Sequence, residues 1–137
     1  MSLERLNPPE LARPSGFAHA VRVRGTVTVH LAGQTALDRD GRIVGRTVVE
    51  QFEQALGNLL TALRAAGGGS EHLASLTIYI VDVPDYRGHA RQIGQVWRRL
   101  AGTDYPATAG IGVARLWDDD ALVEVQGVAE VPAEIPA

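Results

Sequence analysis

The side chains that most often carry enzyme chemistry are few and scattered in this sequence. It contains no cysteine, which excludes disulfides, thiolate catalysis and cysteine-ligated metals. There is no phosphate-binding glycine loop, no Gly-x-Ser-x-Gly turn and no His-Glu-x-x-His helix. The histidines also lack the spacing of metal ligands, so we interpret each as an ordinary strand, loop or helix residue. These histidines are His19, His30, His72 and His89.

Two acidic segments could be mistaken for cation sites. Asp38-Arg39-Asp40-Gly41 resembles the start of a calcium loop but lacks the later ligand positions and the terminal glutamate. We predict a turn there, with Gly41 free to take a positive φ. The run Trp117-Asp118-Asp119-Asp120 is interpreted as the solvated tip of a hairpin, since a run of like charges is usually exposed.

Composition limits the classes of function. The chain has 137 residues, of which 45% are hydrophobic and 21% charged, as expected for one compact soluble domain. A net charge of −3 argues against nucleic acid as a partner, although local basic clusters remain open. No apolar run is long enough to span a membrane, and the N-terminus has no signal-like apolar core. We therefore expect a cytoplasmic protein.

Two segments have the periodicity of amphipathic helices. Residues 47–66 carry an apolar stripe at helical spacing, with Thr47 as the expected N-cap and Glu50 as its capping-box partner. A glycine triplet then ends the helix. A second helix is expected to begin near Pro84 and to end at Gly102.

The other regular segments have the composition and alternation of β-strands. The first two are expected to pair as a β-hairpin, the third to be buried, and the last two to be joined by the acidic run. They cover residues 17–24, 26–34, 73–81, 107–116 and 121–131.

The order of these elements, β-β-α-β-α-β-β, predicts an α+β fold in which two helices cover one face of a mixed sheet. We expect an extended arm over residues 1–16, a single domain over 17–131 and a tail over 132–137. Several strands carry Val, Leu and Ile on both faces, and two helices can cover only one of them. Oligomerisation is therefore a hypothesis from the pattern alone.

Six segments together resemble the Rid family, also called the YjgF/YER057c/UK114 proteins. The resemblance covers about residues 16–130, and its specificity lies in the order and spacing of the segments. It is carried by Phe17 to Val21, Leu31 to Asp38, Gln51 to Gly67, Leu76 to Asp82, Tyr105 to Leu116 and Leu122 to Ala129.

The resemblance implies a chorismate-mutase-like fold and a homotrimer with small-molecule pockets at the subunit clefts. Members of the family that are enzymes hydrolyse enamines and imines to ketones and ammonia. Water attacks the carbon of the C=N bond, so a carboxylate must position the water and the leaving nitrogen must be protonated. No metal or organic cofactor is implied.

The same resemblance assigns site residues. Glu124 stands at the family's glutamate position and is the candidate catalytic residue. Thr108 stands where the family has an arginine that holds the substrate carboxylate. Phe17 replaces a pocket tyrosine, Ala32 replaces the serine before Gly-Gln, and an asparagine of the second helix falls at Gly94.

The predicted ligand-binding set is thus Phe17, Ala32, Gly33, Thr108 and Ala109, in a pocket with less charge and fewer polar groups than the deaminase type. Arg115 is expected to lie too far along its strand to replace the missing arginine, and we interpret it as an ion-pair or interface residue.

Three functions remain open on the sequence. The first is a trimeric metabolite binder that hydrolyses imines or enamines, and the second is a binding or regulatory module without catalysis. The third, an endoribonuclease, is disfavoured because no paired histidines, basic groove or aromatic stacking platform is evident.

Overall fold

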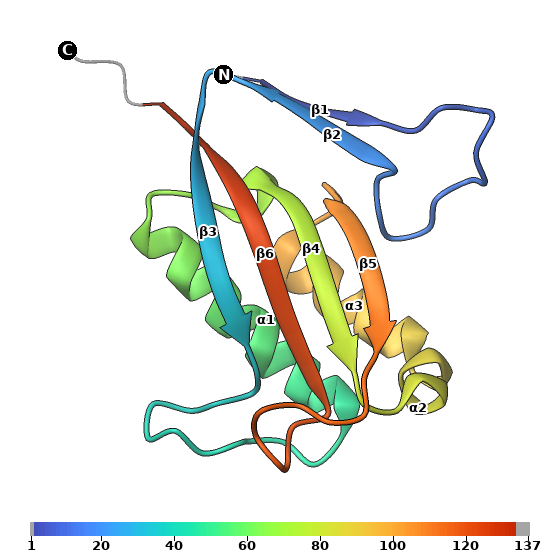
Figure 1. The fold of residues 1–137 in the computed structure, drawn as a ribbon, viewed down its shortest axis with the longest axis vertical. Coiled ribbons are helices and arrows are strands. Elements are labelled where there is room, and N and C mark those ends of the chain that lie inside the picture. Colours follow the sequence, from blue (N-terminus) through green and yellow to red (C-terminus); the bar gives the residue numbers. More distant parts are fainter. Residues whose placement is uncertain (1, 134–137) are drawn as a thin grey trace.

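The structure, a computed structural model, describes residues 2–133 as one α+β domain (Figure 1). Its strands are β1 (Ser2–Leu6), β2 (Ala20–Arg24), β3 (Thr26–Gln34), β4 (Leu73–Ile80), β5 (Ala107–Gly112) and β6 (Val123–Pro132). Its helices are α1 (Val48–Ala65), α2 (Val83–Gly88) and α3 (Ala90–Ala101), with a 3-10 turn at Ser70–His72.

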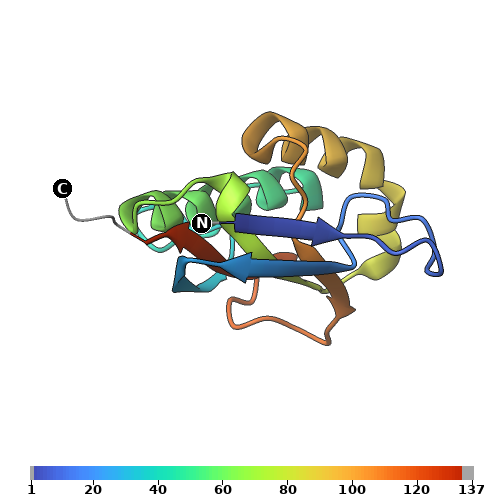
Figure 2. The same ribbon diagram turned by 90° about the horizontal axis from the view of Figure 1, so that it is seen from above.

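The main sheet has the strand order β3-β6-β4-β5, in which only β4 and β5 are parallel. The helices lie together on one side of it, as Figure 2 shows from a second direction. A helical crossover between β4 and β5 is the expected way to join two parallel neighbours. The predicted fold class, α+β with two helices on one face of a mixed sheet, is confirmed, and the short helix α2 is an addition to it.

The first helix forms as its sequence predicts. The Thr47 hydroxyl accepts a hydrogen bond from the Glu50 backbone, and the Glu50 carboxylate accepts one from the Thr47 backbone in return. The apolar stripe of α1 packs on the sheet and forms the core with it. The core's most deeply buried large side chains include Phe52, Leu56, Leu59, Leu63, Leu73, Val123 and Val125.

The predicted pairing of the first two strands is wrong. Strand β2 pairs antiparallel with β1, so part of the segment expected as an extended arm becomes a strand of a separate two-stranded ribbon. Only Gly25, with φ 64°, separates β2 from β3. A β-hairpin needs a loop of about two residues or more. The chain therefore bends at Gly25 without folding back on itself.

The hairpin expected from the last two strands is also wrong, because the acidic run joins β5 and β6 along the chain but the two strands are not neighbours. Strand β6 lies between β3 and β4, and the connection from β5 crosses the end of the sheet. The second predicted helix is two helices, α2 and α3, which meet at His89. The turn predicted around Gly41 is confirmed, and Asp38 accepts backbone hydrogen bonds within it.

The C-terminal tail expected over residues 132–137 falls mostly outside the described residues, and Pro132 is the last residue of β6. In the described part of the chain, no helix has the length and apolar character that crossing a membrane requires.

Candidate functional site

The face of the main sheet that no helix covers, which we call the open face, carries the predicted catalytic residue. Glu124 of β6 lies level with Tyr79 of β4, which in turn lies level with Ile111 of β5. Alternation along each strand then assigns the other open-face residues. They include Thr28, His30, Thr77, Ala109, Gln126, Val128 and Glu130.

The Glu124 side chain lies against the backbone of Gly33 on the adjacent strand β3. A Cβ atom added to Gly33 would come within 3.1 Å of Glu124 Cδ and 3.2 Å of its Oε2. Only glycine leaves this space free, so Gly33 permits this position of the carboxyl group. Burial raises the pKa of the Glu124 carboxyl above its ordinary value, and the negative charge of Asp118 raises it further.

Asp118 is held near Glu124 by side chains from distant parts of the chain. The buried Thr35 hydroxyl donates a hydrogen bond of 2.8 Å to Asp118 Oδ2. The buried Gln51 amide binds the same loop through the Asp120 carbonyl and the Leu122 amide. The acidic run is not the tip of a hairpin, because β5 and β6 are not paired, and Asp118 is half-buried. Asp119 and Asp120 are exposed as predicted. Trp117 is exposed as well, over 95% of its surface.

A first hollow opens beside β5, and we call it the open-face hollow. It has a volume of about 380 Å³ and is lined by the segment Phe17 to His19 and by residues of β4 and β5 that include Ala109. The Ala18 amide donates to the Pro106 carbonyl, which fixes this segment along β5. The Phe17 ring meets the His19 ring edge-on at 5.1 Å. Three predicted ligand-binding residues, Phe17, Thr108 and Ala109, thus line one hollow.

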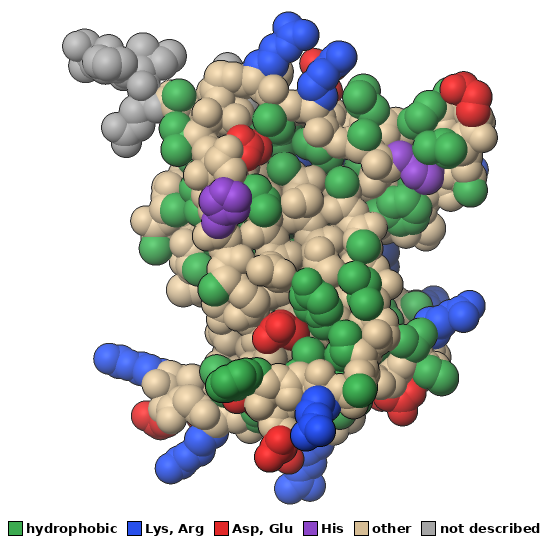
Figure 3. Space-filling model, in the orientation of Figure 1, with side chains coloured by type: hydrophobic (Ala, Val, Ile, Leu, Met, Phe, Trp, Pro, Cys, Tyr) green, Lys and Arg blue, Asp and Glu red, His purple; other side chains and the backbone are tan. Residues whose placement is uncertain are grey.

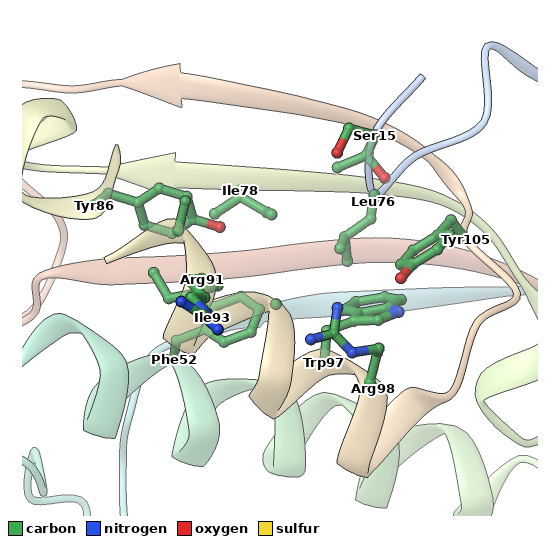
Figure 4. Close-up of a pocket in the computed structure, with 14 residues that line it drawn as sticks. Ser15, Phe52, Leu76, Ile78, Tyr86, Arg91, Ile93, Trp97, Arg98 and Tyr105 are labelled. Atoms are coloured by element: carbon green, nitrogen blue, oxygen red, sulfur yellow. The ribbon is translucent and has the colours of Figure 1, made fainter. Parts of the chain in front are cut away.

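A second hollow lies on the other side of β5, between that strand and α3, and we call it the helix-side cavity (Figure 4). Its volume is about 460 Å³. Thr108 faces it, because Thr108 pairs with the buried Leu76 on the helix-covered face. The Thr108 hydroxyl donates to the Pro106 carbonyl at 2.9 Å. The walls include Ser15, Phe52, Leu76, Ile78, Tyr86, Arg91, Ile93, Gly94, Trp97, Arg98 and Tyr105.

One chain does not bring all the predicted site residues together. Glu124 and Gly33 touch, and the exposed Ala32 adjoins them, but these three line neither hollow. Strand β4 separates β5 from β6, and Thr108 is level with Gly127, so Thr108 lies two strand spacings of about 4.8 Å across the sheet and three residues along it from Glu124. Their side chains also point to opposite faces of the sheet.

Some residues of this region were not identified from sequence. Asp118 is interpreted from the sequence only as one of a run of charges. Its position six residues before Glu124 is the signal that could have indicated that the two carboxyl groups lie close together. No sequence motif marks Arg91 or Arg98 as functional residues. Their spacing of about two turns of an amphipathic helix is the signal that places them on one face of it. Arg115 is exposed and has no ion-pair partner within residues 2–133.

No group of three or more histidine or acidic side chains within residues 2–133 could hold a metal ion. On the open face, the groups that could act on a ligand include the Glu124 carboxyl, the Tyr79 hydroxyl and the exposed backbone beside Gly33. This is an arrangement for orienting water and a small polar group.

The family model described as Endoribonuclease L-PSP matches residues 10–131. The chain belongs to the Rid family. Among its relatives, the RutC family protein UK114 of Drosophila melanogaster is 33% identical over 103 residues, covering 74% of this chain and 71% of that protein. The human 2-iminobutanoate/2-iminopropanoate deaminase is 27% identical over 103 residues, covering 74% of this chain and 72% of that enzyme.

Solved structures of the Rid family agree with this assignment. A Yersinia pestis member called YyfB, described as a conserved Rid protein of unknown function, superposes with a TM-score of 0.85. It is 32% identical, and the match covers 96% of this chain and 100% of YyfB. The fold and family expected from the sequence are therefore confirmed.

Proposed function

We propose that this Rid-family protein binds a small metabolite at clefts between identical chains and hydrolyses its C=N bond with Glu124 as the group that orients water. The observation that carries the proposal is the placement of Glu124. Its carboxyl group lies on the open face, packs against Gly33, and has a raised pKa because of burial and Asp118.

The chemistry needs one group that accepts a proton and a pocket that holds an imine or enamine. Water adds its oxygen to the carbon of the C=N bond while Glu124 accepts a proton from it. The resulting carbinolamine expels ammonia after its nitrogen is protonated, and a ketone remains. The sequence contains no lysine and no cysteine, so a covalent intermediate on an amine or thiolate is excluded.

The separation of the two halves within one chain supports an assembled site. Glu124 and Gly33 lie on β6 and β3, whereas Phe17 and Ala109 line the open-face hollow beside β5 at the far edge of the sheet. A homotrimer that covers the open faces would bring the first pair of one chain next to the second pair of its neighbour. Closed cyclic symmetry is the usual arrangement for such contacts.

The open face has the character of a surface that another chain can cover. In Figure 3 its middle is mostly uncharged, and the charged side chains lie mainly around the rim. Ile111 is 43% exposed there. Depletion of charge in the centre with a polar rim is the usual composition of a protein interface.

We further propose that the substrate is not a typical amino-acid-derived imine, because Thr108 stands where the family resemblance predicts the carboxylate-binding arginine. Its hydroxyl is already engaged with the Pro106 carbonyl. Losing a charged hydrogen bond costs about 1.5–3 kcal/mol, which is roughly a tenfold to hundredfold loss in affinity. A substrate that is neutral or that holds its charge elsewhere fits the proposal better.

The direct test is ammonia release from imines generated in the assay by an amino-acid oxidase. Acidic, neutral and basic amino acids are compared with amines oxidised to imines that carry no carboxylate. We expect release with the second group, and a fall of about 10²–10⁴-fold in the Glu124→Gln variant. Glu10→Gln, in the exposed N-terminal segment, is the matched control and should keep full activity.

A second candidate function is a binding module without catalysis. It is favoured by the same observation, that position 108 carries a threonine and not the positively charged arginine that the resemblance predicts. No ammonia release from any imine, together with ligand binding that survives Glu124→Gln, would replace the enzyme proposal with this one. Ribonuclease activity is not favoured, since the net charge is −3. RNA digestion by highly purified protein that is abolished by Glu124→Gln would reverse that ranking.

A further inference from the structure

Tyr79 stands beside Glu124 on the neighbouring strand. The two residues are level in the antiparallel register of β4 and β6, and both side chains lie on the open face. Residues directly opposite one another in such a pair have Cβ atoms about 4.5–5.5 Å apart. A small molecule held at the Glu124 carboxyl group is therefore within reach of the Tyr79 side chain.

The Tyr79 hydroxyl is held in one direction by a side chain of β6. It donates a hydrogen bond of 3.1 Å to Gln126 Oε1, two residues along β6 from Glu124. A phenol has a single proton to donate and can also accept through its oxygen. Because that proton is used in the bond to Gln126, the Tyr79 oxygen presents its acceptor side to a ligand. It is suited to receive an N–H group.

The Glu124 carboxyl group extends toward the opposite strand. It packs against Gly33 of β3, and β6 separates β3 from β4. Two strand spacings place β3 and β4 about 9.6 Å apart. A small planar group above β6 would thus have the carboxyl group on one side and the phenol oxygen on the other. Hydrolysis of a C=N bond needs two such contacts, one at the attacking water and one at the nitrogen.

The charge of this region favours a nitrogen that carries a proton. Asp118 lies close enough for its negative charge to act on the Glu124 carboxyl group. Neither carboxyl group has an ion-pair partner within residues 2–133. A cationic C=NH₂⁺ group is attracted to such a site and has N–H groups to donate to Tyr79. It is also the form of the imine that water attacks most readily.

We propose that Tyr79 determines the specificity of the Glu124 site by accepting a hydrogen bond from a protonated imine nitrogen, and that Gln126 is the positioning residue that orients its hydroxyl. The inference rests on the proposed function, because it concerns the same site. The substrate class is an iminium ion that has N–H groups and no carboxylate, as formed when a primary amine is oxidised.

The proposed contact fits the balance of the reaction. Water adds to the iminium carbon, the electron pair of the C=N π bond moves to nitrogen, and Glu124 takes the proton that the water loses. Glu124 then returns this proton to the nitrogen of the carbinolamine, and the C–N bond breaks as the oxygen forms the carbonyl bond. The hydroxyl proton passes to the released ammonia. Tyr79 makes no covalent bond and holds the nitrogen in place.

Binding of propionamidine tests the contact without any reaction. Its amidinium group is planar, charged at neutral pH and bears N–H groups, so it is a stable substitute for an iminium ion. Propionamide has the same shape without the charge. Calorimetry should show propionamidine bound about tenfold more tightly than propionamide. Tyr79→Phe keeps the ring and removes only the hydroxyl, and it should weaken propionamidine binding about tenfold and propionamide binding by less.

A double-mutant cycle tests the role of Gln126. Gln126→Leu removes the acceptor of the Tyr79 proton and should weaken propionamidine binding about fivefold. In the Tyr79→Phe background the same substitution should have no further effect, because Gln126 acts through the hydroxyl. Gln95→Leu, at an exposed position of α3 on the other side of the sheet, is the matched control and should bind like the parent.

The affinity for propionamidine decides the inference. Equal affinity in the parent and in Tyr79→Phe, or no binding to the parent, would overturn it even if imines are hydrolysed. Where an amine oxidase supplies the iminium ion, Tyr79→Phe should also lower kcat/KM about tenfold. Absence of hydrolysis by the parent, together with propionamidine binding that Tyr79→Phe weakens, would refute the proposed function and leave the contact at Tyr79 standing.

Discussion

The two faces of the main sheet differ in what completes them. The helix-covered face is finished within one chain, where side chains such as Leu59 are fully buried between α1 and the strands. The open face carries Glu124 and Ile111 and has no cover from the described residues of its own chain (Figure 3). An antiparallel sheet can leave one face in water. Here that face carries the partly buried carboxyl group of Glu124, and the proposed assembly would cover it.

The difference between the two faces would disappear if buried side chains of the helix-covered face could be truncated without loss of stability. Leu59→Ala should lower the free energy of unfolding by about 2–5 kcal/mol, since it leaves a cavity in the core. Urea unfolding at fixed protein concentration measures this. Leu11→Ala, at a residue 51% exposed in the N-terminal segment, is the control and should change it by about 0.5 kcal/mol or less.

A substitution on the open face is expected to change the association of the chains and not the folding of each chain. Ile111→Asp should prevent association of the chains, because a carboxylate would be buried unpaired in the interface at a cost of several kcal/mol. The single chain should keep its circular dichroism spectrum. Leu11→Asp adds the same charge away from the open face and should associate normally, and an associated Ile111→Asp protein would contradict the assignment of this face.

An arginine introduced at position 108 tests whether this residue lines the ligand pocket. Thr108→Arg should raise the affinity for small carboxylates such as benzoate or 2-oxobutanoate about tenfold or more, through charge-assisted hydrogen bonds. Calorimetry on both proteins measures the change. Affinity equal to that of the unmodified chain would mean that Thr108 does not occupy the predicted pocket position.

The fit between Gly33 and Glu124 makes a finer prediction. Gly33→Ala should lower imine hydrolysis by displacing the carboxyl group, which a Cβ atom would approach to 3.1 Å. Its stability should change little, since the glutamate side chain can rotate away. Gly57→Ala in α1 has no atom near the new Cβ and should stabilise the helix by up to about 1 kcal/mol without affecting activity.

The raised pKa of Glu124 predicts the smallest effect. The folded chain keeps the Glu124 proton at pH values where the unfolded chain has lost it, so this group's contribution to stability declines as pH rises through that range. Glu124→Gln should therefore gain stability relative to the parent between acid and neutral pH, as urea unfolding at several pH values would measure. Hydrolysis should increase over the same range, because only the ionised carboxylate accepts a proton.

The sequence predicts local structure well where the signal is local. Thr47 and Glu50 are three residues apart, and the capping box they form needs no information from elsewhere in the chain. The pairing of β2 with β1 and the insertion of β6 between β3 and β4 depend on contacts between distant segments. Alternation along a strand specifies its faces but not its neighbours.

The candidate site divides in the same way. The family resemblance predicts Glu124, Gly33 and Thr108 as site residues. Only the structure shows that the side chains of Glu124 and Thr108 lie on opposite faces of the sheet. The contact of Asp118 with Thr35 joins residues 83 positions apart. No periodicity or spacing in the sequence carries such a contact, because it arises from the packing of two loops.

The mass of the unmodified protein in solution, measured by sedimentation over a range of concentrations, tests assembly of the open faces most directly. A trimer, at about three times the chain mass of 14.6 kDa, is the expected species. A protein that stays at the mass of a single chain at micromolar concentration would leave Glu124 apart from Phe17 and Ala109, and would contradict the site proposed between chains.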